Sequence, residues 1–595
     1  MSKQFLMGNE AIARGAVDAG VNLACGYPGT PSTEILETLA KINDGSVYVE
    51  WSVNEKAALE VAAGAAYSGA RTLVTMKQVG LNVASDPLMS LAYVGVKGGM
   101  VIVSADDPGP ISSQTEQDTR HFARFSKLPV FDPSSPEEAY EMIKDAFELS
   151  EKIGSPVLFR PTTRVCHGCA SVEVSDEKIV NKPEGFIKDT MRWVIFPRTS
   201  YLNHIKIEKR NSELSDELSS YRFNTVSGGG KKGVACGGIS VAYTKEALSL
   251  LGTDAKLFKV ATPFPFPEKL ALEFLKGLDE VTVIEELDPV IERELIYICG
   301  KYNLNVKING KLNGKVQPAG ENSVDSVCEV LAGFLDVDYA KPVSSETPEL
   351  PVRPPVLCAG CPHRASFYAV KQAMKGKKAV FSGDIGCYTL GNAKPLDMVD
   401  TCLCMGADVT IAQGIHRIEP DTVNFSFIGD STFFASGITG VVNAVYNQTD
   451  IVLIVLDNST TAMTGHQPHP GTGVSISGTV AGRISIENVL RAIGVASVET
   501  VDPLDLKASV EAVRKAAELS GVKAVIFKSP CIAVVKPSKS YSVNTDKCIG
   551  CMKCIRELGC PALVKSGKKV AVEPSLCTGC SVCSQVCPVG ALEVK

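Results

Sequence analysis

The sequence predicts an α/β fold made of several domains with parallel sheets, followed by a small cysteine-rich module. Strand-like apolar runs alternate with helix-like segments through most of the chain, which is typical of parallel sheets. Two polar stretches interrupt this alternation. The last 48 residues carry eight of the 20 cysteines. With 595 residues in total, the usual domain size predicts about four domains.

The first domain is expected over residues 1–185. Its helix–strand alternation starts with a helix from Gly8 to Ala19 and a strand from Val21 to Gly26. The next elements are a helix rich in small residues and two apolar strands, at Ala57–Tyr67, Leu73–Met76 and Met100–Ser104. This order predicts a parallel sheet with helical connections.

Composition places the remaining boundaries. Residues 186–232 are polar, end in a glycine–lysine run and are predicted to be an irregular linker. Further α/β domains are expected over 233–345 and 346–540, and the cysteine-rich module over 541–595. The predicted strands of the two α/β domains lie near Gly233–Cys236, Val281–Ile284, Phe425–Ile428 and Ile451–Leu456.

The C-terminal cysteines form two similar runs. The first run is Cys548, Cys551, Cys554 and Cys560, and the second is Cys577, Cys580, Cys583 and Cys587. This spacing is typical of two-cluster bacterial ferredoxins, in which the fourth cysteine of each run binds the other cluster. One predicted [4Fe–4S] cluster therefore uses Cys548, Cys551, Cys554 and Cys587, and the other uses Cys577, Cys580, Cys583 and Cys560. The five-residue gap before Cys560 leaves the nuclearity of the second cluster open.

Other uses of these cysteines fit less well. Zinc sites usually combine two CxxC pairs or include histidine, and disulfides need an oxidising compartment. The chain has no apolar signal core, and no run approaches the ~18 apolar residues of a membrane span. We therefore expect a cytoplasmic protein that handles single electrons. The net charge of -6 argues against nucleic acid as a partner.

A second site is predicted where two neighbouring strands end. The strand Phe425–Ile428 leads into Gly429-Asp430-Ser431, and the strand Ile451–Leu456 leads into Asp457-Asn458. Glycine permits a tight turn beneath a phosphate, and a helix N-terminus offers N–H groups to an anion. Asp430, Asn458 and the backbone carbonyl of Thr460 could bind a Mg²⁺ that also holds diphosphate oxygens. The alternative is an ordinary strand–helix turn with an incidental aspartate.

This site resembles the thiamine diphosphate motif, GDG followed by an asparagine, with Ser431 in place of the second glycine. The flanking segments resemble the thiamine domain of 2-oxoacid:ferredoxin oxidoreductases. They are Cys358-Ala-Gly-Cys361-Pro-His363-Arg364, Gly386-Cys387, Thr464-Gly465-His466-Gln467 and Ser529-Pro530-Cys531. Near the N-terminus, the segment Tyr27–Ser32 and Glu55 resemble the pyrimidine-binding domain of the same family. The resemblance covers nearly the whole chain. Within the family, the domain order and the CAGCPHR and TGHQ segments resemble the alpha subunits of indolepyruvate:ferredoxin oxidoreductases.

The resemblance implies a fold and a set of cofactors. Residues 1–185 would be a pyrimidine-binding thiamine domain, 233–345 a middle domain like the C-terminal domain of transketolase, 346–540 a diphosphate-binding thiamine domain and 541–595 a two-cluster ferredoxin domain. The cofactors would be thiamine diphosphate, Mg²⁺ and two [4Fe–4S] clusters. Gly429, Asp430, Ser431, Asn458, Thr460 and His466 would contact thiamine diphosphate or its metal. A third [4Fe–4S] cluster would use Cys358, Cys361, Cys387 and Cys531, and the alternative is a reduced cysteine pair or a zinc site with His363.

The resemblance also implies catalytic roles. Glu55 would bind the aminopyrimidine of thiamine and promote loss of the thiazolium C2 proton, with Glu60 as the second choice. Thr30 would contact the substrate carboxylate or carbonyl, or else only complete its turn. His363 and His466 would assist near thiamine, or serve as structural hydrogen-bonding groups.

The implied reaction converts an aryl 2-oxoacid, such as indolepyruvate, and coenzyme A into acyl-CoA and CO₂. Electrons would pass through the iron–sulfur clusters to external ferredoxin. One alternative is an oxidoreductase for pyruvate, 2-oxoglutarate or a branched-chain 2-oxoacid. Another is an electron-transfer subunit without catalysis. The family's gamma-type domain has no counterpart here, which implies a smaller beta subunit in a heterodimer or a dimer of heterodimers. The sequence sets neither the preferred oxoacid nor the coenzyme A site.

The other cysteines give weaker signals. Cys166 and Cys169 form a lone CxxC pair, and Cys402 and Cys404 could compete as cluster ligands. The remaining four lie in apolar surroundings and are predicted core residues: Cys25, Cys236, Cys299 and Cys328.

Overall fold

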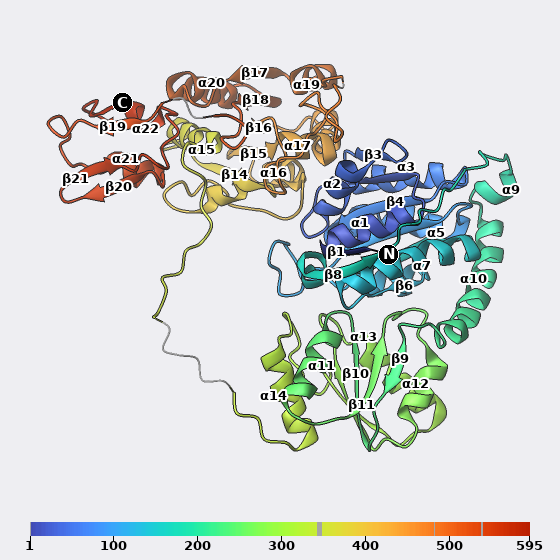
Figure 1. Ribbon diagram of the computed structural model, residues 1–595. Helices are drawn as coiled ribbons and strands as arrows, with labels where there is room; N and C mark the ends of the chain where they lie inside the picture. Colours follow the sequence, from blue (N-terminus) through green and yellow to red (C-terminus); the bar gives the residue numbers. More distant parts are fainter. Residues whose placement is uncertain (1, 342–347, 481, 537–538, 595) are drawn as a thin grey trace. The chain divides into compact units, whose positions relative to one another are not determined.

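The computed structural model describes residues 2–341, 348–480, 482–536 and 539–594. The chain divides into two compact units, Met1–Thr347 and Pro348–Lys595, and each contains parallel sheet (Figure 1). The predicted boundary between residues 345 and 346 lies outside the described residues.

A six-stranded parallel sheet forms the first half of the first unit, in the order β3-β2-β4-β5-β7-β6. Its strands are β2 (Leu23–Gly26), β3 (Tyr48–Trp51), β4 (Thr72–Lys77), β5 (Met100–Ala105), β6 (Val130–Phe131) and β7 (Val157–Phe159). The accompanying helices are α1 (Gly8–Asp18), α2 (Thr33–Ile42), α3 (Glu55–Tyr67), α4 (Gln78–Val83), α5 (Ser85–Val94), α6 (Arg120–Ser126), α7 (Pro136–Ile153) and α8 (Thr163–His167). An antiparallel ribbon joins β1 (Ser2–Met7) to β8 (Cys169–Val174).

The predicted strands of this sheet are confirmed. The central strand β5 is buried along its whole length, because helices cover both faces of a sheet of this type. Its sequence is accordingly apolar at nearly every position rather than at alternate ones.

The second sheet of this unit has five strands in the order β13-β12-β10-β11-β9, with β9 antiparallel to β11. The strands are β9 (Thr225–Ser227), β10 (Lys232–Gly237), β11 (Lys256–Val260), β12 (Glu280–Ile284) and β13 (Lys307–Asn309). The helices are α11 (Ser240–Leu250), α12 (Glu268–Leu275), α13 (Val290–Tyr302) and α14 (Val324–Leu335).

The prediction of irregular structure over residues 186–232 is wrong. This segment contains the short helix α9 (Thr190–Trp193), the 22-residue helix α10 (Pro197–Leu218) and the edge strand β9. Only a narrow stripe of α10 is buried, at Ile207, Asn211, Leu214 and Leu218. Because so few positions of the helix need apolar residues, its sequence is as polar as that of a linker.

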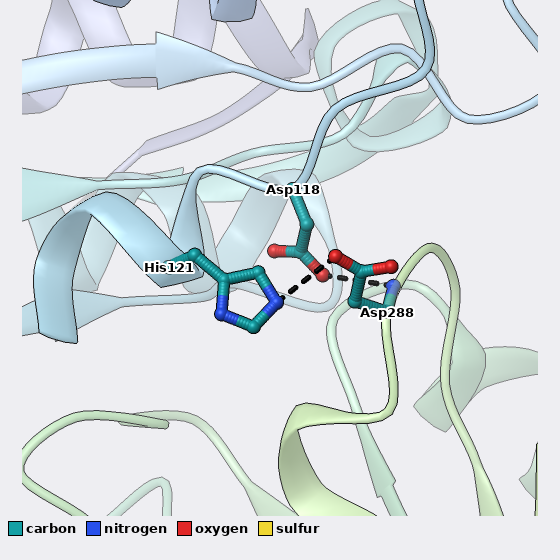
Figure 2. Close-up of side chains that lie close together, drawn as sticks. All are labelled: Asp118, His121 and Asp288. Carbon is teal, nitrogen blue, oxygen red and sulfur yellow. Dashed lines mark hydrogen bonds and ion pairs between the residues drawn. The ribbon is translucent and has the colours of Figure 1, made fainter. Parts of the chain in front are cut away.

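Ion pairs connect the two sheets of the first unit. Arg120 binds Asp118 at 2.6 Å and Glu285 at 2.8 Å, and all three side chains are almost fully buried. Nearby, Nε2 of His121 lies 2.9 Å from a carboxylate oxygen of Asp288, as Figure 2 shows. These contacts join α6 to the loop between β12 and α13.

The second unit contains a five-stranded parallel sheet in the order β14-β15-β16-β18-β17. The strands are β14 (Ala379–Ser382), β15 (Val423–Gly429), β16 (Ile451–Asp457), β17 (Ser497–Val501) and β18 (Val522–Lys528). The helices are α15 (Pro362–Ala373), α16 (Ala407–Ile418), α17 (Asp430–Thr432), α18 (Ile438–Tyr446), α19 (Ile486–Ile493) and α20 (Leu506–Glu518). A 3₁₀ helix covers Cys387–Asn392, and a π-helical turn, Phe433–Gly437, joins α17 to α18.

The cysteine-rich module packs on this sheet domain. It consists of the strand pairs β19 (Tyr541–Val543) with β22 (Leu592–Val594) and β20 (Leu563–Ser566) with β21 (Lys569–Val572), and the short helices α21 (Lys553–Leu558) and α22 (Val582–Val586). Leu558, Val582 and Val586 belong to the same apolar cluster as Phe367 and Phe427 of the sheet domain. The module and the sheet domain therefore share one hydrophobic core.

No helix in the described part of the chain is both long enough and apolar enough to cross a lipid bilayer.

Candidate functional site

Two neighbouring strands bring the predicted metal ligands together. β15 and β16 are paired in parallel, with Gly429 opposite Leu456, so Asp430 and Asn458 follow the same edge of the sheet. Asp430 begins α17 directly after β15. Carboxyl ends of parallel strands are the usual place for ligands in such sheets.

The Asp430 carboxylate is buried and held in one orientation. Its oxygens accept hydrogen bonds from the N–H of Ser431 at 2.9 Å and the N–H of Ser459 at 2.8 Å. Nε2 of His469 lies 3.1 Å from Oδ2. Burial raises the pKa of Asp430, and the hydrogen bond to His469 opposes that rise. A carboxylate in these surroundings is stabilised by a cation.

Asn458 lies between Asp430 and the start of α15. Its Nδ2 is 3.2 Å from Nε2 of His363, and its Oδ1 accepts the N–H of Thr460 at 3.2 Å. Burial lowers the pKa of His363 to about 4, so this imidazole is neutral at physiological pH. Carboxylate, amide and carbonyl oxygens are ligands that suit Mg²⁺, and Asp430, Asn458 and the loop at Thr460 supply such atoms.

The glycine of the motif is required by packing. A Cβ atom at Gly429 would lie 2.5 Å from the ring of Tyr388. The Tyr388 hydroxyl donates to Asp384 at 2.7 Å, and burial raises the pKa of Asp384 to about 6. The Tyr388 ring leaves no room for a side chain at position 429. A glycine there lets a ligand approach the backbone closely.

The buried histidine next to Asp430 is His469, whereas the predicted histidine of the TGHQ segment is exposed. His466 is exposed, whereas His469 is 8 % exposed and contacts Asp430. His466 has a positive φ of 68°, and its N–H is bonded to Thr461. His469 was not predicted from the sequence because it lies two residues after the TGHQ segment, which ends at Gln467.

Glu55 has different surroundings in the first unit. It begins α3 after the cap residue Asn54, whose side chain accepts the N–H of Ala57. Glu55 is 8 % exposed, and burial raises its pKa, with Lys77 opposing the rise. A Cβ atom at Gly80 would lie 2.6 Å from Oε1 of Glu55. The carboxyl group is therefore packed against the backbone of α4.

Lys77, which the sequence reasoning missed, links Glu55 to the loop of Thr30. Its stem passes Gly29, where a Cβ atom would lie 3.1 Å away, and its Nζ donates to Gln114 at 3.2 Å. Burial lowers the pKa of Lys77, while Glu55 and Asp107 oppose that shift. The available signal was a lysine directly after the predicted strand Leu73–Met76.

The other two predicted groups of this region differ in their surroundings. Thr30 is partly exposed, and its carbonyl accepts a long hydrogen bond from Ser112 at 3.4 Å. Glu60 is exposed and pairs with Lys56 on the surface of α3. Glu60 thus has the environment of a surface charge, which favours Glu55 over it.

The cysteines of the module line two separate cavities. One cavity is lined by Cys548, Cys551, Cys554 and Cys587. The other is lined by Cys560, Cys577, Cys580 and Cys583. The crossing of the fourth cysteines, expected from spacing, matches these two groupings.

The cysteine sulfurs of the described residues are not gathered as a single zinc ion would require. No three cysteines of the described residues hold their sulfur atoms within 4.8 Å of one another, whereas a tetrahedral zinc site with bonds of ~2.3 Å needs sulfurs about 3.8 Å apart. The N–H groups of Tyr541 and Ala591 point to the sulfurs of Cys577 and Cys587 at 3.4 and 3.3 Å. Such donors stabilise the negative charge of cluster sulfur.

The cysteines proposed for a third cluster lie near the Asp430 pocket. The N–H of Cys361 bonds to the carbonyl of Cys358 at 3.3 Å. Burial raises the pKa of Cys387, and the nearby Cys531 and Cys358 raise it further. The N–H of Cys531 donates to the carbonyl of Asn458 at 2.9 Å.

The remaining cysteines form no comparable set. Cys166 is buried and Cys169 is exposed, and Cys402 and Cys404 are both exposed. The predicted core positions are confirmed, since each of the four is at most 8 % exposed: Cys25, Cys236, Cys299 and Cys328.

Asp118, His121 and Asp288 bring three possible ligand atoms within 4.8 Å of one another (Figure 2). Both oxygens of Asp118, however, accept hydrogen bonds from Arg120, and one also accepts the N–H of Asp288. This cluster is accordingly an ion-pair contact between the two sheets of the first unit.

Three family models match the chain. They are the "Thiamine pyrophosphate enzyme, C-terminal TPP binding domain" at residues 384–527, the "Pyruvate flavodoxin/ferredoxin oxidoreductase, thiamine diP-bdg" at 14–214 and the "4Fe-4S binding domain" at 570–593. The first includes Asp430 and Asn458, and the second includes Glu55 and Lys77.

Relatives match over almost the whole length. The chain is 45% identical to the indolepyruvate oxidoreductase subunit IorA of Methanothermobacter thermautotrophicus, covering 99% of this chain and 97% of that protein. It is 42% identical to the IorA subunit of Thermococcus kodakarensis, covering 93% and 91%. The 2-oxoglutarate synthase subunit KorA of Archaeoglobus fulgidus is 26% identical over 50% of this chain and 92% of its own length. With these full-length relatives, two thiamine-binding domain matches and a 4Fe–4S domain match, this chain belongs to the IorA family of indolepyruvate oxidoreductase subunits, enzymes of the 2-oxoacid:ferredoxin oxidoreductase type.

Proposed function

We propose that the chain oxidatively decarboxylates aryl 2-oxoacids, such as indolepyruvate, with coenzyme A, yielding acyl-CoA and CO₂. Two electrons per turnover leave one at a time through iron–sulfur clusters to an external ferredoxin. The observation that carries this proposal is the hydrogen bond from Cys531 N–H to the Asn458 carbonyl. Through it, a candidate cluster ligand is directly attached to a candidate metal ligand, so that redox and thiamine chemistry are neighbours in one domain.

Asp430, Asn458 and the carbonyl of Thr460 would hold Mg²⁺ and, through it, the diphosphate of thiamine. The fit is supported by the buried carboxylate of Asp430, whose pKa burial raises. The close packing of Gly429 on Tyr388 also supports it, because the loop carries no side chain that would block a phosphate. His469 contacts Oδ2 of Asp430, the oxygen that also accepts the N–H of Ser459, and so helps to hold the carboxylate in place.

When bound, thiamine diphosphate supplies the electron sink for loss of CO₂ from a 2-oxoacid. Glu55 would exchange a proton with the ring nitrogen of the aminopyrimidine, a role that suits a buried carboxyl group with a raised pKa. Lys77 keeps that pKa from rising further. Thr30, on the loop that Lys77 passes, would orient the substrate carboxylate or carbonyl, and the neutral His363 would hold Asn458 in place.

Three cysteine sets would hold [4Fe–4S] clusters: Cys358 with Cys361, Cys387 and Cys531; Cys560 with Cys577, Cys580 and Cys583; and Cys548 with Cys551, Cys554 and Cys587. The last two sets each line one cavity of the module. A decarboxylase that is not an oxidoreductase has no use for such a relay. We further propose a smaller beta subunit with a gamma-type domain as partner, and a cytoplasmic location.

The test is an anaerobic assay of the purified chain with its co-purifying subunit. Indolepyruvate, phenylpyruvate, pyruvate, 2-oxoglutarate and a branched-chain 2-oxoacid are each supplied with coenzyme A and a viologen dye. We expect dye reduction to be fastest with the aryl substrates and to require coenzyme A. Faster reduction with pyruvate or 2-oxoglutarate would assign another substrate. Absence of thiamine diphosphate from active preparations would refute the thiamine chemistry itself.

A further inference from the structure

Two cysteine loops from distant parts of the sequence touch each other. The loop Cys358-Ala-Gly-Cys361 lies before α15, and the loop Cys577-Thr-Gly-Cys580 lies in the module. Gly360 has φ +73°, and a Cβ atom there would overlap Oγ1 of Thr578. Cys361 lines the same cavity as Cys560, Cys577 and Cys580. The cysteines at Cys548, Cys551 and Cys554 line the other cavity.

Arg364 lies at this contact and donates hydrogen bonds both to the module and to the segment before α15. One terminal nitrogen donates to the carbonyls of Leu558 at 2.6 Å and Gly559 at 2.9 Å, next to Cys560. The other donates to the carbonyls of Leu357 and Cys358. The residue is 6 % exposed and lines the cavity of Cys560, Cys577, Cys580 and Cys583.

One donor of this guanidinium is left over. Its Nε is buried and has no hydrogen-bond partner among the described protein atoms. A buried donor without a partner is costly, and more so when the group is charged. Cysteine thiolates and the sulfides of a cluster are acceptors, and five cysteines line the cavity that Arg364 also lines.

We propose that Arg364 is a positioning residue for electron transfer, whose Nε–H donates to sulfur of the cluster held by Cys560, Cys577, Cys580 and Cys583. Hydrogen bonds to the sulfurs and nearby positive charge stabilise the more negative, reduced form of such a cluster. Arg364 thereby raises the reduction potential of this cluster above that of its counterpart in the module. Electrons arriving at Cys358 and Cys361 then enter the module at this cluster first. The inference rests on the proposed function, because it requires the clusters.

The experiment is a potentiometric titration followed by EPR on the full chain with its co-purifying subunit, purified anaerobically. Arg364→Gln removes the charge, and Arg364→Lys keeps a charge but has no Nε–H in the same place. In both variants we expect one cluster to become harder to reduce, with a larger shift for Gln. For Gln the one-electron equilibrium should change about tenfold or more, which is ~59 mV.

Tyr368→Phe is the matched control. Tyr368 is on the same helix, and its hydroxyl donates to Glu557 of the module at 2.6 Å, so its loss weakens docking without moving a charge. We expect wild-type potentials in this variant. Equal shifts in Tyr368→Phe and the Arg364 variants would assign the effect to docking and overturn the inference. Wild-type potentials in an Arg364 variant with full iron content would also overturn it, as would loss of iron from both Arg364 variants.

Iron content of the wild-type chain separates this inference from the proposed function. If the wild-type protein holds no clusters, the proposed function fails and this inference fails with it. If it holds them and the Arg364 variants keep the wild-type potentials, only the role of Arg364 is refuted.

Discussion

Glu55 and Asp430 are both buried carboxyl groups next to parallel sheets, and burial raises the pKa of both. Their surroundings differ. Asp430 accepts two backbone N–H groups and contacts His469. Glu55 is packed against Gly80, and a hydrogen bond with its own backbone and then the charge of Lys77 oppose the rise in its pKa.

The difference separates two kinds of chemistry. N–H donors favour the ionised form of a carboxylate and hold it in one orientation, as a metal ligand needs. A carboxyl group packed against backbone, with few donors, changes its proton more readily. Position on a sheet therefore does not distinguish a metal ligand from an acid–base group, whereas the hydrogen-bond donors around the carboxyl group do.

The largest effect is expected from Asp430→Ala, which tests the metal-ligand half of this comparison. The substitution removes the charged ligand, so Mg²⁺-dependent thiamine diphosphate binding should be abolished. The iron of the two module clusters should remain, because their cysteines line separate cavities. Bound thiamine and iron are measured on the same sample. Asp421→Ala, at an exposed turn before β15, is the control, and thiamine at wild-type occupancy in Asp430→Ala would contradict the assignment.

Glu55→Gln tests the other half. The amide fills the same space but cannot exchange a proton, so thiamine diphosphate should still bind while turnover falls ~10²–10⁴-fold. Steady-state rates are compared with bound thiamine. Glu60→Gln, at an exposed position on the same helix, should retain near-normal activity. If Glu60→Gln lost the activity and Glu55→Gln kept it, the roles of the two residues would be exchanged.

Cys387→Ser sharpens the comparison by testing whether a third [4Fe–4S] cluster lies near Asp430. Three cube clusters predict about twelve irons per chain and two predict about eight. We expect about twelve in the wild-type protein and about eight in the variant, because the module clusters remain. Cys402→Ser, at an exposed cysteine, should keep about twelve. Eight irons in an anaerobically reconstituted wild-type chain would exclude the third cluster.

Glu286 extends the comparison to a buried carboxyl group without a proposed function. Its substitution by glutamine is expected to have the smallest effect, a change in stability with pH. Burial raises its pKa to about 7 in the folded chain, with the N–H of Asn322 and then Arg160 opposing the rise. The folded state binds the Glu286 proton more tightly than the unfolded state does. The contribution of this proton to the free energy of unfolding is therefore fully present below about pH 4.5 and is lost as the pH rises through about 7. Glu286→Gln should remove this decline, stabilising the region at pH 8 by about 1–3 kcal/mol.

Hydrogen exchange of the β12 amides at several pH values measures this effect. Asp118→Asn is the control of opposite sign, because Arg120 holds the pKa of Asp118 well below its usual range. Breaking the buried Asp118–Arg120 pair should destabilise the contact between the two sheets of the first unit at neutral pH by ~3–5 kcal/mol. A Glu286→Gln variant whose amides lose protection at pH 8 would contradict the prediction.

Much of the fold could be predicted because buried parallel strands need apolar residues at nearly every position. The strands β5 and β16 follow from that rule alone. The helix α10 could not be predicted, since it buries only one narrow stripe and its other residues are free to be polar.

The candidate site could be predicted where ligands directly follow strands, as Asp430 and Asn458 do. His469 could not, because it reaches Asp430 only through the fold of the loop after β16. Lys77 has the same explanation: its charge acts on Glu55 from the end of β4 to the start of α3. Neither contact leaves a local pattern, since each depends on how separate segments meet.

The contact between Gly360 and Thr578, together with the core shared by Leu558 and Phe367, fixes the ferredoxin-like module to its sheet domain. A module held in this way cannot swing outward to meet an acceptor. Any soluble electron carrier must diffuse to the module, so delivery is a second-order process whose rate rises with carrier concentration. Where charges steer the encounter, that rate also falls with added salt.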